Sequence, residues 1–153
     1  MNKKILVIGA GQLGSRYIQG LARYAQKSVV DVVDPSKKSL EIAKTRWEEV
    51  LSKSIIEHNL SFNLNLNKPK KNYDLAIVAT GSKERAKIIE YYSKVTTVDY
   101  WIIEKTLAQT PSDLEKISIS VQNSLGAWVN TSRRIQKLYK KLKEEIKMVS
   151  PVS

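Results

Sequence analysis

Short apolar runs alternate with amphipathic segments along the whole chain. Five runs are typical of buried strands, at residues 3–8, 29–33, 73–80, 98–105 and 127–130. Residues 61–66 alternate polar and apolar side chains, as a half-exposed strand does. The segments between the strands repeat apolar residues every three or four positions, which predicts helices. This alternation predicts a single α/β domain, doubly wound around a mainly parallel sheet.

The predicted helices differ in their bounds, their caps and the residues of their apolar stripes. The first should run from about residue 11 to residue 27, and its apolar stripe is Leu13, Tyr17, Leu21 and Ala25. Trp47 falls within the stripe of the second, which places it in the core. The fourth begins at Thr110 as a cap, with Pro111 at the first helical position. The last is basic, and its inner face should be formed by Leu138, Leu142 and Ile146.

The first strand leads directly into Gly9–Gly14, which reads G-x-G-x-x-G. This arrangement holds a dinucleotide diphosphate: the first glycine allows a tight turn, the second lets the backbone approach the phosphates, and the third lets the helix pack on the strand. The first N–H groups of the helix have no partner in the chain and can point at the anion. The predicted diphosphate contacts are Gly9, Gly11, Gln12, Leu13 and Gly14.

Asp34 ends the second strand, 20 residues after Gly14, where an acid should meet the ribose hydroxyls. Its carboxylate accepts hydrogen bonds from free hydroxyls and repels a 2′-phosphate, which favours NAD(H). Lys37 and Lys38 lie close enough to weaken this preference, so NADP(H) remains an alternative. Asp34 can also be interpreted as a turn or helix-cap residue before Pro35.

Two further strands end in polar residues. Thr80, Gly81 and Ser82 follow the third apolar run, where the nicotinamide half of a dinucleotide would pass, because ligands bind at the carboxyl ends of parallel strands. An ordinary strand–helix turn is the alternative. Glu104 and Lys105 end the next strand, and from their position alone a surface ion pair is an equal alternative.

The amino-acid composition limits the kinds of molecule that this chain is expected to bind. The net charge of the 153 residues is +11, but basic residues gather at 133–147 as the solvated face of a helix, so nucleic-acid binding is not expected. The absence of cysteine excludes disulfides and thiolate zinc sites. No apolar run approaches the roughly 20 residues of a membrane span. With no signal peptide recognised, we expect a cytoplasmic protein.

His58, the single histidine, has no visible partner and is interpreted as a surface residue, neither ligand nor catalyst.

The chain resembles the N-terminal NAD(P)-binding Rossmann domain of the Gfo/Idh/MocA oxidoreductases. Three landmarks carry the resemblance: the glycine motif with Asp34, Ala79–Ser82, and Glu104–Ala108, which is similar to the family's Glu-Lys-Pro motif followed by Leu-Ala. Thr106 replaces the usual proline, and Arg85 stands where many members have a histidine. The segment that joins the two domains of the family is similar to Asn130, Arg133, Arg134 and Tyr139.

The resemblance implies hydride transfer between a nicotinamide cofactor and a polyol, sugar or sugar nucleotide. It makes Lys105 the catalytic candidate, because an ammonium beside the nicotinamide eases loss of a substrate hydroxyl proton and helps align the cofactor. Glu104 would orient Lys105 or contact the nicotinamide ribose. The candidate substrate contacts are Lys105, Asn130 and Arg134.

The resemblance also implies which part of the family's two-domain architecture this chain contains. Residues 1–148 are expected to form the dinucleotide-binding domain, and residues 149–153 a tail or the start of a C-terminal domain. In the family that domain supplies most substrate contacts and forms the oligomer. With Lys105 as the only proton acceptor recognised, we expect the chain to bind NAD(P) but to be incomplete for catalysis. The alternatives are a stand-alone nucleotide-binding or regulatory module, and an unrelated doubly wound protein, against which Glu104 and Lys105 argue.

Overall fold

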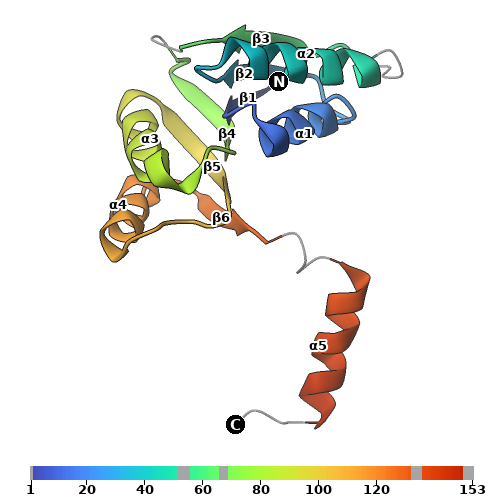
Figure 1. The fold of residues 1–153 in the computed structure, drawn as a ribbon, viewed down its shortest axis with the longest axis vertical. Coiled ribbons are helices and arrows are strands. Elements are labelled where there is room, and N and C mark those ends of the chain that lie inside the picture. Colours follow the sequence, from blue (N-terminus) through green and yellow to red (C-terminus); the bar gives the residue numbers. More distant parts are fainter. Residues whose placement is uncertain (1, 52–55, 66–68, 132–135, 150–153) are drawn as a thin grey trace.

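The computed structural model describes residues 2–51, 56–65, 69–131 and 136–149. Six strands form one sheet in the order β3-β2-β1-β4-β5-β6, and every neighbouring pair is parallel (Figure 1). The strands are β1 Lys3–Ile8, β2 Ser28–Val33, β3 Asn59–Asn63, β4 Asn72–Val78, β5 Thr97–Glu104 and β6 Gly126–Asn130. The helices are α1 Gln12–Leu21, α2 Lys37–Leu51, α3 Ser82–Val95, α4 Pro111–Val121 and α5 Lys137–Val149. The predicted doubly wound α/β fold is confirmed.

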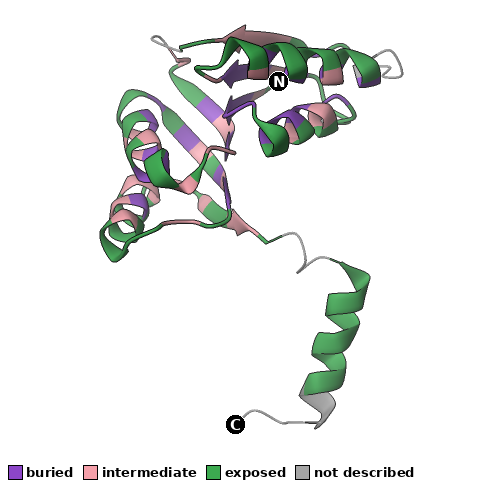
Figure 2. Ribbon diagram, viewed as in Figure 1, coloured by how far each residue is buried: buried purple, intermediate pink, exposed green. Residues whose placement is uncertain are grey.

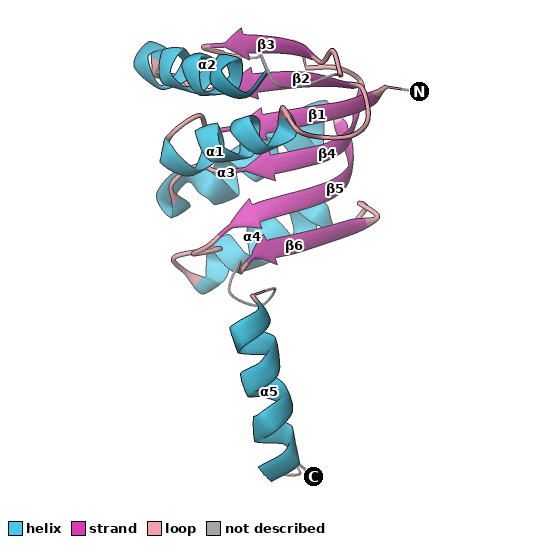
Figure 3. Ribbon diagram, turned by 90° about the vertical axis from the view of Figure 1, so that its right-hand side faces the viewer, coloured by secondary structure: helices cyan, strands magenta, loops and turns pink. Residues whose placement is uncertain are grey.

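Two apolar layers hold this sheet together. Helices α1 and α2 cover one face, and α3 and α4 cover the other (Figure 3). Trp47 is buried in the first layer, as its helical spacing predicts, and Trp101 in the second. The chain starts at β1, winds outward to β3 and returns to β4 on the other side of β1. The carboxyl ends of β1 and β4 therefore form the switch point where such folds bind ligands.

Helix α1 is shorter than its apolar pattern predicts. It ends at Leu21 rather than near Lys27, and Ala25 lies exposed beyond it. Ten residues rise about 15 Å, which is close to the roughly 20 Å length of a six-residue strand. A helix continued to Lys27 would overrun the sheet before the chain could enter β2. Leu13 is also exposed, because the buried face of α1 runs through Gly14, Ser15 and Ile18.

His58 is buried, which corrects its interpretation as a surface residue. Its Nδ1 lies 2.8 Å from the hydroxyl of Ser28, and its ring meets Trp47 edge-on at 5.7 Å. Burial lowers the pKa of His58 below its ordinary value. Both partners come from other elements, so the polar residues next to His58 in sequence gave no sign of them. The following strand, β3, spans Asn59–Asn63. The predicted strand at 61–66 is therefore wrong in its bounds, because residues 64 and 65 are not strand, and residue 66 lies outside the described residues.

The buried carboxylate of Asp31 on β2 forms hydrogen bonds to side chains of β3 and β4. Its carboxylate accepts hydrogen bonds from the Tyr73 hydroxyl at 2.8 Å and the Ser61 hydroxyl at 2.7 Å, and it pairs with Lys70. Burial raises the pKa of the Asp31 carboxyl, but the bonds from Lys70, Ser61 and Tyr73 outweigh burial and hold this pKa below its ordinary value. The cluster therefore fixes β3 and β4 on either side of the inner strands.

The last helix does not pack on the sheet. Helix α5 stands away from the rest of the chain, and its side chains described up to residue 146 are exposed (Figures 1 and 2). The predicted inner face of Leu138, Leu142 and Ile146 is therefore wrong as a contact, although the helix and its apolar stripe are present. Across the described residues, none of the helices has the length and apolar character that crossing a membrane requires.

Candidate functional site

Three glycines shape the loop between β1 and α1 in different ways. Gly9 has φ +95°, and a Cβ there would lie 3.0 Å from the backbone of Ala79 and Thr80. A Cβ on Gly14 would lie 1.8 Å from the carbonyl oxygen of Gly9. At Gly11 a Cβ would meet no described atom within 4 Å beyond its chain neighbours. The first and third glycines thus serve the packing of the loop, whereas Gly11 keeps a space open above it.

The start of α1 opens into that space. Gly11 is the N-cap and offers no side-chain cap, and the first helical bond runs from Ser15 N–H to the Gly11 carbonyl at 2.9 Å. The first N–H groups of a helix lack helical partners and carry the positive end of its dipole. Gln12 and Leu13 are exposed at this end. These donors and the bare glycine fit a diphosphate.

Asp34 connects the end of β2 to the glycine loop. One carboxylate oxygen accepts a hydrogen bond from the Ala10 N–H at 2.7 Å, and the other accepts one from the Ser36 N–H at 2.8 Å. The second contact is the turn role considered from the sequence, while Ser36 caps α2 through the Ser39 N–H at 3.2 Å. Asp34 is half-buried, and each of its oxygens can accept a further bond. The turn role and a ribose-binding role are therefore compatible.

The ends of β4 and β5 are joined by the buried guanidinium of Arg85 on α3. It donates to the carbonyl of Glu104 at 2.6 Å and to the carbonyls of Thr80 and Thr106. Burial lowers the pKa of Arg85. Gly81 caps α3, and Ser82 accepts a bond from the Gln109 amide at 3.0 Å. Arg85 therefore holds together the two loops between which the predicted nicotinamide path runs.

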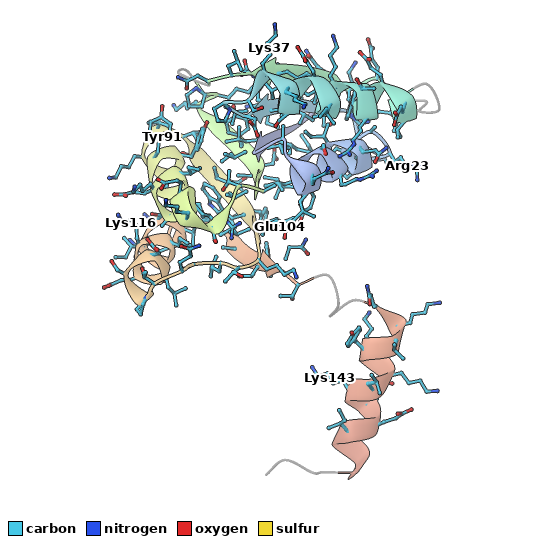
Figure 4. The ribbon with its side chains drawn as sticks, in the orientation of Figure 1. Arg23, Lys37, Tyr91, Glu104, Lys116 and Lys143 are labelled. Atoms are coloured by element: carbon cyan, nitrogen blue, oxygen red, sulfur yellow. The ribbon has the colours of Figure 1, made fainter. Side chains whose placement is uncertain are left out.

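Glu104 is the centre of a polar cluster between α1 and β6 (Figure 4). Its carboxylate accepts bonds from the Tyr17 hydroxyl at 2.5 Å and the Asn130 amide at 2.6 Å, and the same amide contacts the Tyr17 oxygen. Glu104 is buried. Burial and the adjacent carboxylate raise the pKa of the Tyr17 hydroxyl. A carboxylate so held is fixed in one orientation.

A cleft of about 330 Å³ brings several predicted residues together. It is lined by Leu13, Arg16, Tyr17, Glu104, Lys105 and Asn130. The exposed Lys105 follows the buried Glu104, whose carboxylate also accepts the Lys105 N–H at 3.2 Å. The peptide bond between Lys105 and Thr106 is cis. Arg134, the remaining predicted substrate contact, lies outside the described residues.

Two residues of this site were not predicted as members. The sequence predicts Tyr17 in the apolar stripe of the first helix, but its hydroxyl reaches Glu104 at the end of β5. From the sequence, Arg85 is only a departure from the pattern of the resembled family. Its spacing to the buried Ile89 and Tyr92 places it on the inward face of α3, and this spacing is a sequence signal for a buried cation.

The sheet order, the glycine loop and the crevice above it define a Rossmann-type α/β domain. A family model described as ketopantoate reductase PanE/ApbA matches residues 5–103, and the chain belongs to that family. A search of curated protein sequences gives no match.

Solved dehydrogenase structures share the fold. Scyllo-inositol dehydrogenase from Lactobacillus casei, with bound NAD(H) and scyllo-inositol, aligns over 97% of this chain with TM-score 0.73 and 14% identity. The WlbA dehydrogenase from Bordetella pertussis, in complex with NADH and UDP-GlcNAcA, aligns over 97% with TM-score 0.72 and 14% identity. Myo-inositol dehydrogenase from L. casei, in complex with NAD(H) and myo-inositol, aligns over 97% with TM-score 0.70 and 20% identity. In each case the chain spans 42% of that structure's length.

Proposed function

We propose that this chain binds NAD(H), with residues 1–148 as the nucleotide-binding domain of a Gfo/Idh/MocA-type oxidoreductase acting on a polyol, sugar or sugar nucleotide. The observation that carries the proposal is the space kept open by Gly11 at the uncapped start of α1, with Asp34 beside the same loop. The proposed anion site and ribose acceptor would lie next to each other there. The neighbouring structures with bound NAD(H) support this choice of ligand.

Different described residues would contact the adenosine half and the nicotinamide half of the dinucleotide. The N–H groups of Gln12 and Leu13 would hold the diphosphate, and Asp34 the adenosine ribose. Asp34 favours NAD(H) over NADP(H), because its carboxylate would face a 2′-phosphate with like charge. Lys37, expected from the sequence to weaken this preference, is exposed, and its Nζ lies 4.0 Å from the carboxylate of Glu41. Thr80, Gly81 and Ser82 would flank the path toward Glu104.

The cleft beyond Glu104 is the proposed place of reaction. Hydride transfer is the chemistry that the nicotinamide supplies when bound, and the protein supplies position and charge. The Lys105 ammonium would stabilise the charge that develops on a substrate oxygen as its proton leaves. Tyr17 and Asn130 fix Glu104, which in turn would orient Lys105 or contact the nicotinamide ribose. Asn130 also lines the cleft and is a proposed substrate contact, as is Arg134.

Sugar-type substrates are proposed because two of the neighbours hold inositols and one holds UDP-GlcNAcA. The family match favours a second candidate, the reduction of a keto acid such as ketopantoate. The two differ in the group that reacts, a secondary alcohol in one case and a carbonyl beside a carboxylate in the other. Since the chain spans 42% of the neighbours, binding without turnover is expected of it alone.

Calorimetric titration with NADH, NADPH and ADP tests the proposal. We expect NADH to bind more tightly than NADPH, and ADP, which lacks the nicotinamide and its ribose, to bind through the adenosine half alone. NADH absorbance with inositol, a UDP-sugar acid or ketopantoate should show no turnover by this chain alone. The role of Lys105 is tested by NADH binding, which Lys105→Met should weaken relative to Lys83→Met, a change at another exposed lysine. Failure of every dinucleotide to bind would refute the proposal. Tighter or equal binding of NADPH would refute the preference for NAD(H).

A further inference from the structure

Part of one sheet face lacks a covering helix. Helices α1 and α2 lie over β1 to β3 and reach β4, whose Ile77 is buried in the same apolar cluster, but no helix in the described part of the chain lies over β5 and β6 on that side (Figure 3). Tyr100 on β5 and Trp128 on β6 project there with 40% and 56% of their surfaces exposed. Their rings stack at 5.7 Å between centroids, with 26° between the planes. The sheet thus presents a rigid aromatic surface to solvent.

This surface forms the floor of a groove of about 470 Å³ beside α1. Leu21 and Tyr24 form one wall, and Leu75, Tyr100 and Trp128 line the floor. Lys3, Asp74 and Asp99 lie at its polar end. Lys3 pairs with Asp74 at 2.8 Å, whereas the carboxylate of Asp99 has no hydrogen bond or ion pair among the described residues. The groove is apolar along its length and carries one spare negative charge.

Helix α5 carries an apolar stripe without a partner. Leu138, Leu142 and Ile146 are 65%, 42% and 63% exposed, and their spacing of four residues places them on one side of the helix. The stripe is about 12 Å long at 1.5 Å per residue. Lysines such as Lys143 border it, and Lys140 lies on the opposite side. The helix continues outward past the edge strand β6, so this stripe does not face its own sheet (Figures 1 and 3).

We propose that the groove receives α5 from a second copy of this chain, so that two copies exchange their last helices. The stripe of Leu138, Leu142 and Ile146 would cover Tyr100 and Trp128, and a bordering lysine would approach Asp99. A helix directed away from its own sheet is placed to reach a neighbouring molecule. The exchange is self-complementary, because each copy donates one helix and accepts one, so it closes as a two-fold dimer. This inference does not depend on nucleotide binding.

Crosslinking between separately prepared variants tests the exchange, and the absence of native cysteine makes the reaction specific. Leu142→Cys protein labelled with 15N is mixed with unlabelled Tyr100→Cys protein and treated with a short bis-maleimide. We expect a covalent dimer whose mass contains one labelled and one unlabelled chain. Lys140→Cys, on the far side of α5, is the matched control and should give much less of this product with Tyr100→Cys.

Two further measurements complete the test. By light scattering during size exclusion, the unmodified chain should have the mass of a dimer, and Leu142→Asp should have that of a monomer while Lys140→Asp stays dimeric. A double Leu142→Cys/Tyr100→Cys chain should crosslink between chains. Crosslinking confined within single chains, a monomeric unmodified protein, or a dimer that persists in Leu142→Asp would each overturn the proposal.

Discussion

Gly11→Ala separates nucleotide binding from folding at the glycine loop. The added Cβ would meet no described atom within 4 Å beyond the chain neighbours, and φ −63° with ψ −162° is open to alanine. Replacing a glycine N-cap by alanine typically costs about 1 kcal/mol. The fold should therefore remain, with the methyl group in the space proposed for the diphosphate.

The expected loss of affinity follows from the donors that the methyl group would displace. A hydrogen bond to a charged group contributes about 1.5–3 kcal/mol. Loss of one such bond from a helix N–H to a phosphate oxygen corresponds to a roughly 10- to 150-fold higher Kd for NADH, at about 1.4 kcal/mol per tenfold change.

Fluorescence titration with NADH measures this effect, and urea unfolding at the same temperature measures stability. Gly20→Ala is the matched control, because Gly20 is an exposed position within α1 whose Cβ would also meet no described atom within 4 Å. It should raise the free energy of unfolding by about 0.5–1 kcal/mol and leave NADH binding unchanged. A folded Gly11→Ala protein that binds NADH as tightly as the unmodified chain would show that no diphosphate lies over this loop.

Three other substitutions test the packing around the site. Gly14→Ala should lower the free energy of unfolding by about 1–3 kcal/mol, because its Cβ falls 1.8 Å from the Gly9 carbonyl oxygen; an unchanged urea midpoint would contradict this. Arg85→Met should lower stability by about 2 kcal/mol, since three carbonyls lose their donor, and calorimetry should show weaker binding of NADH but not of ADP. Asp31→Asn should lower stability by about 1–3 kcal/mol at neutral pH. Because the folded pKa of Asp31 is depressed, its contribution is present above the unfolded pKa of about 3.9 and is lost as pH falls through the folded value. Urea unfolding at several pH values checks this, and a difference that persists in strong acid would contradict it.

Much of the architecture followed from local pattern. Among the described residues, six strands and five helices occur in the predicted order, because a buried strand needs a continuous apolar run and a covering helix needs a repeat near 3.6. The glycine motif and Asp34 come together as expected, since the carboxyl ends of neighbouring parallel strands share one edge. Lys105 likewise lies at the carboxyl end of β5, where it lines a cleft.

Other features required contacts between distant residues. The burial of His58 depends on Ser28 and Trp47, and the role of Arg85 depends on carbonyls that end two different strands. Tyr17 looked like a core residue because its ring matches an apolar stripe, while its hydroxyl is used 87 residues away at Glu104. The spacing of apolar residues predicts the type and the buried face of a single helix or strand. It does not predict which distant residues that element contacts.

The amphipathic pattern of α5 shows the division most clearly. Its sequence alone determines a helix with one apolar side, because Leu138, Leu142 and Ile146 recur every four residues. Which surface that side meets is decided only in three dimensions, by where the chain leaves β6 and which part of the sheet is still uncovered. Local sequence sets the shape and polarity of an element because these arise from backbone geometry and nearby side chains. Its partner depends on the free energy of burial against residues from the rest of the fold, or from another molecule.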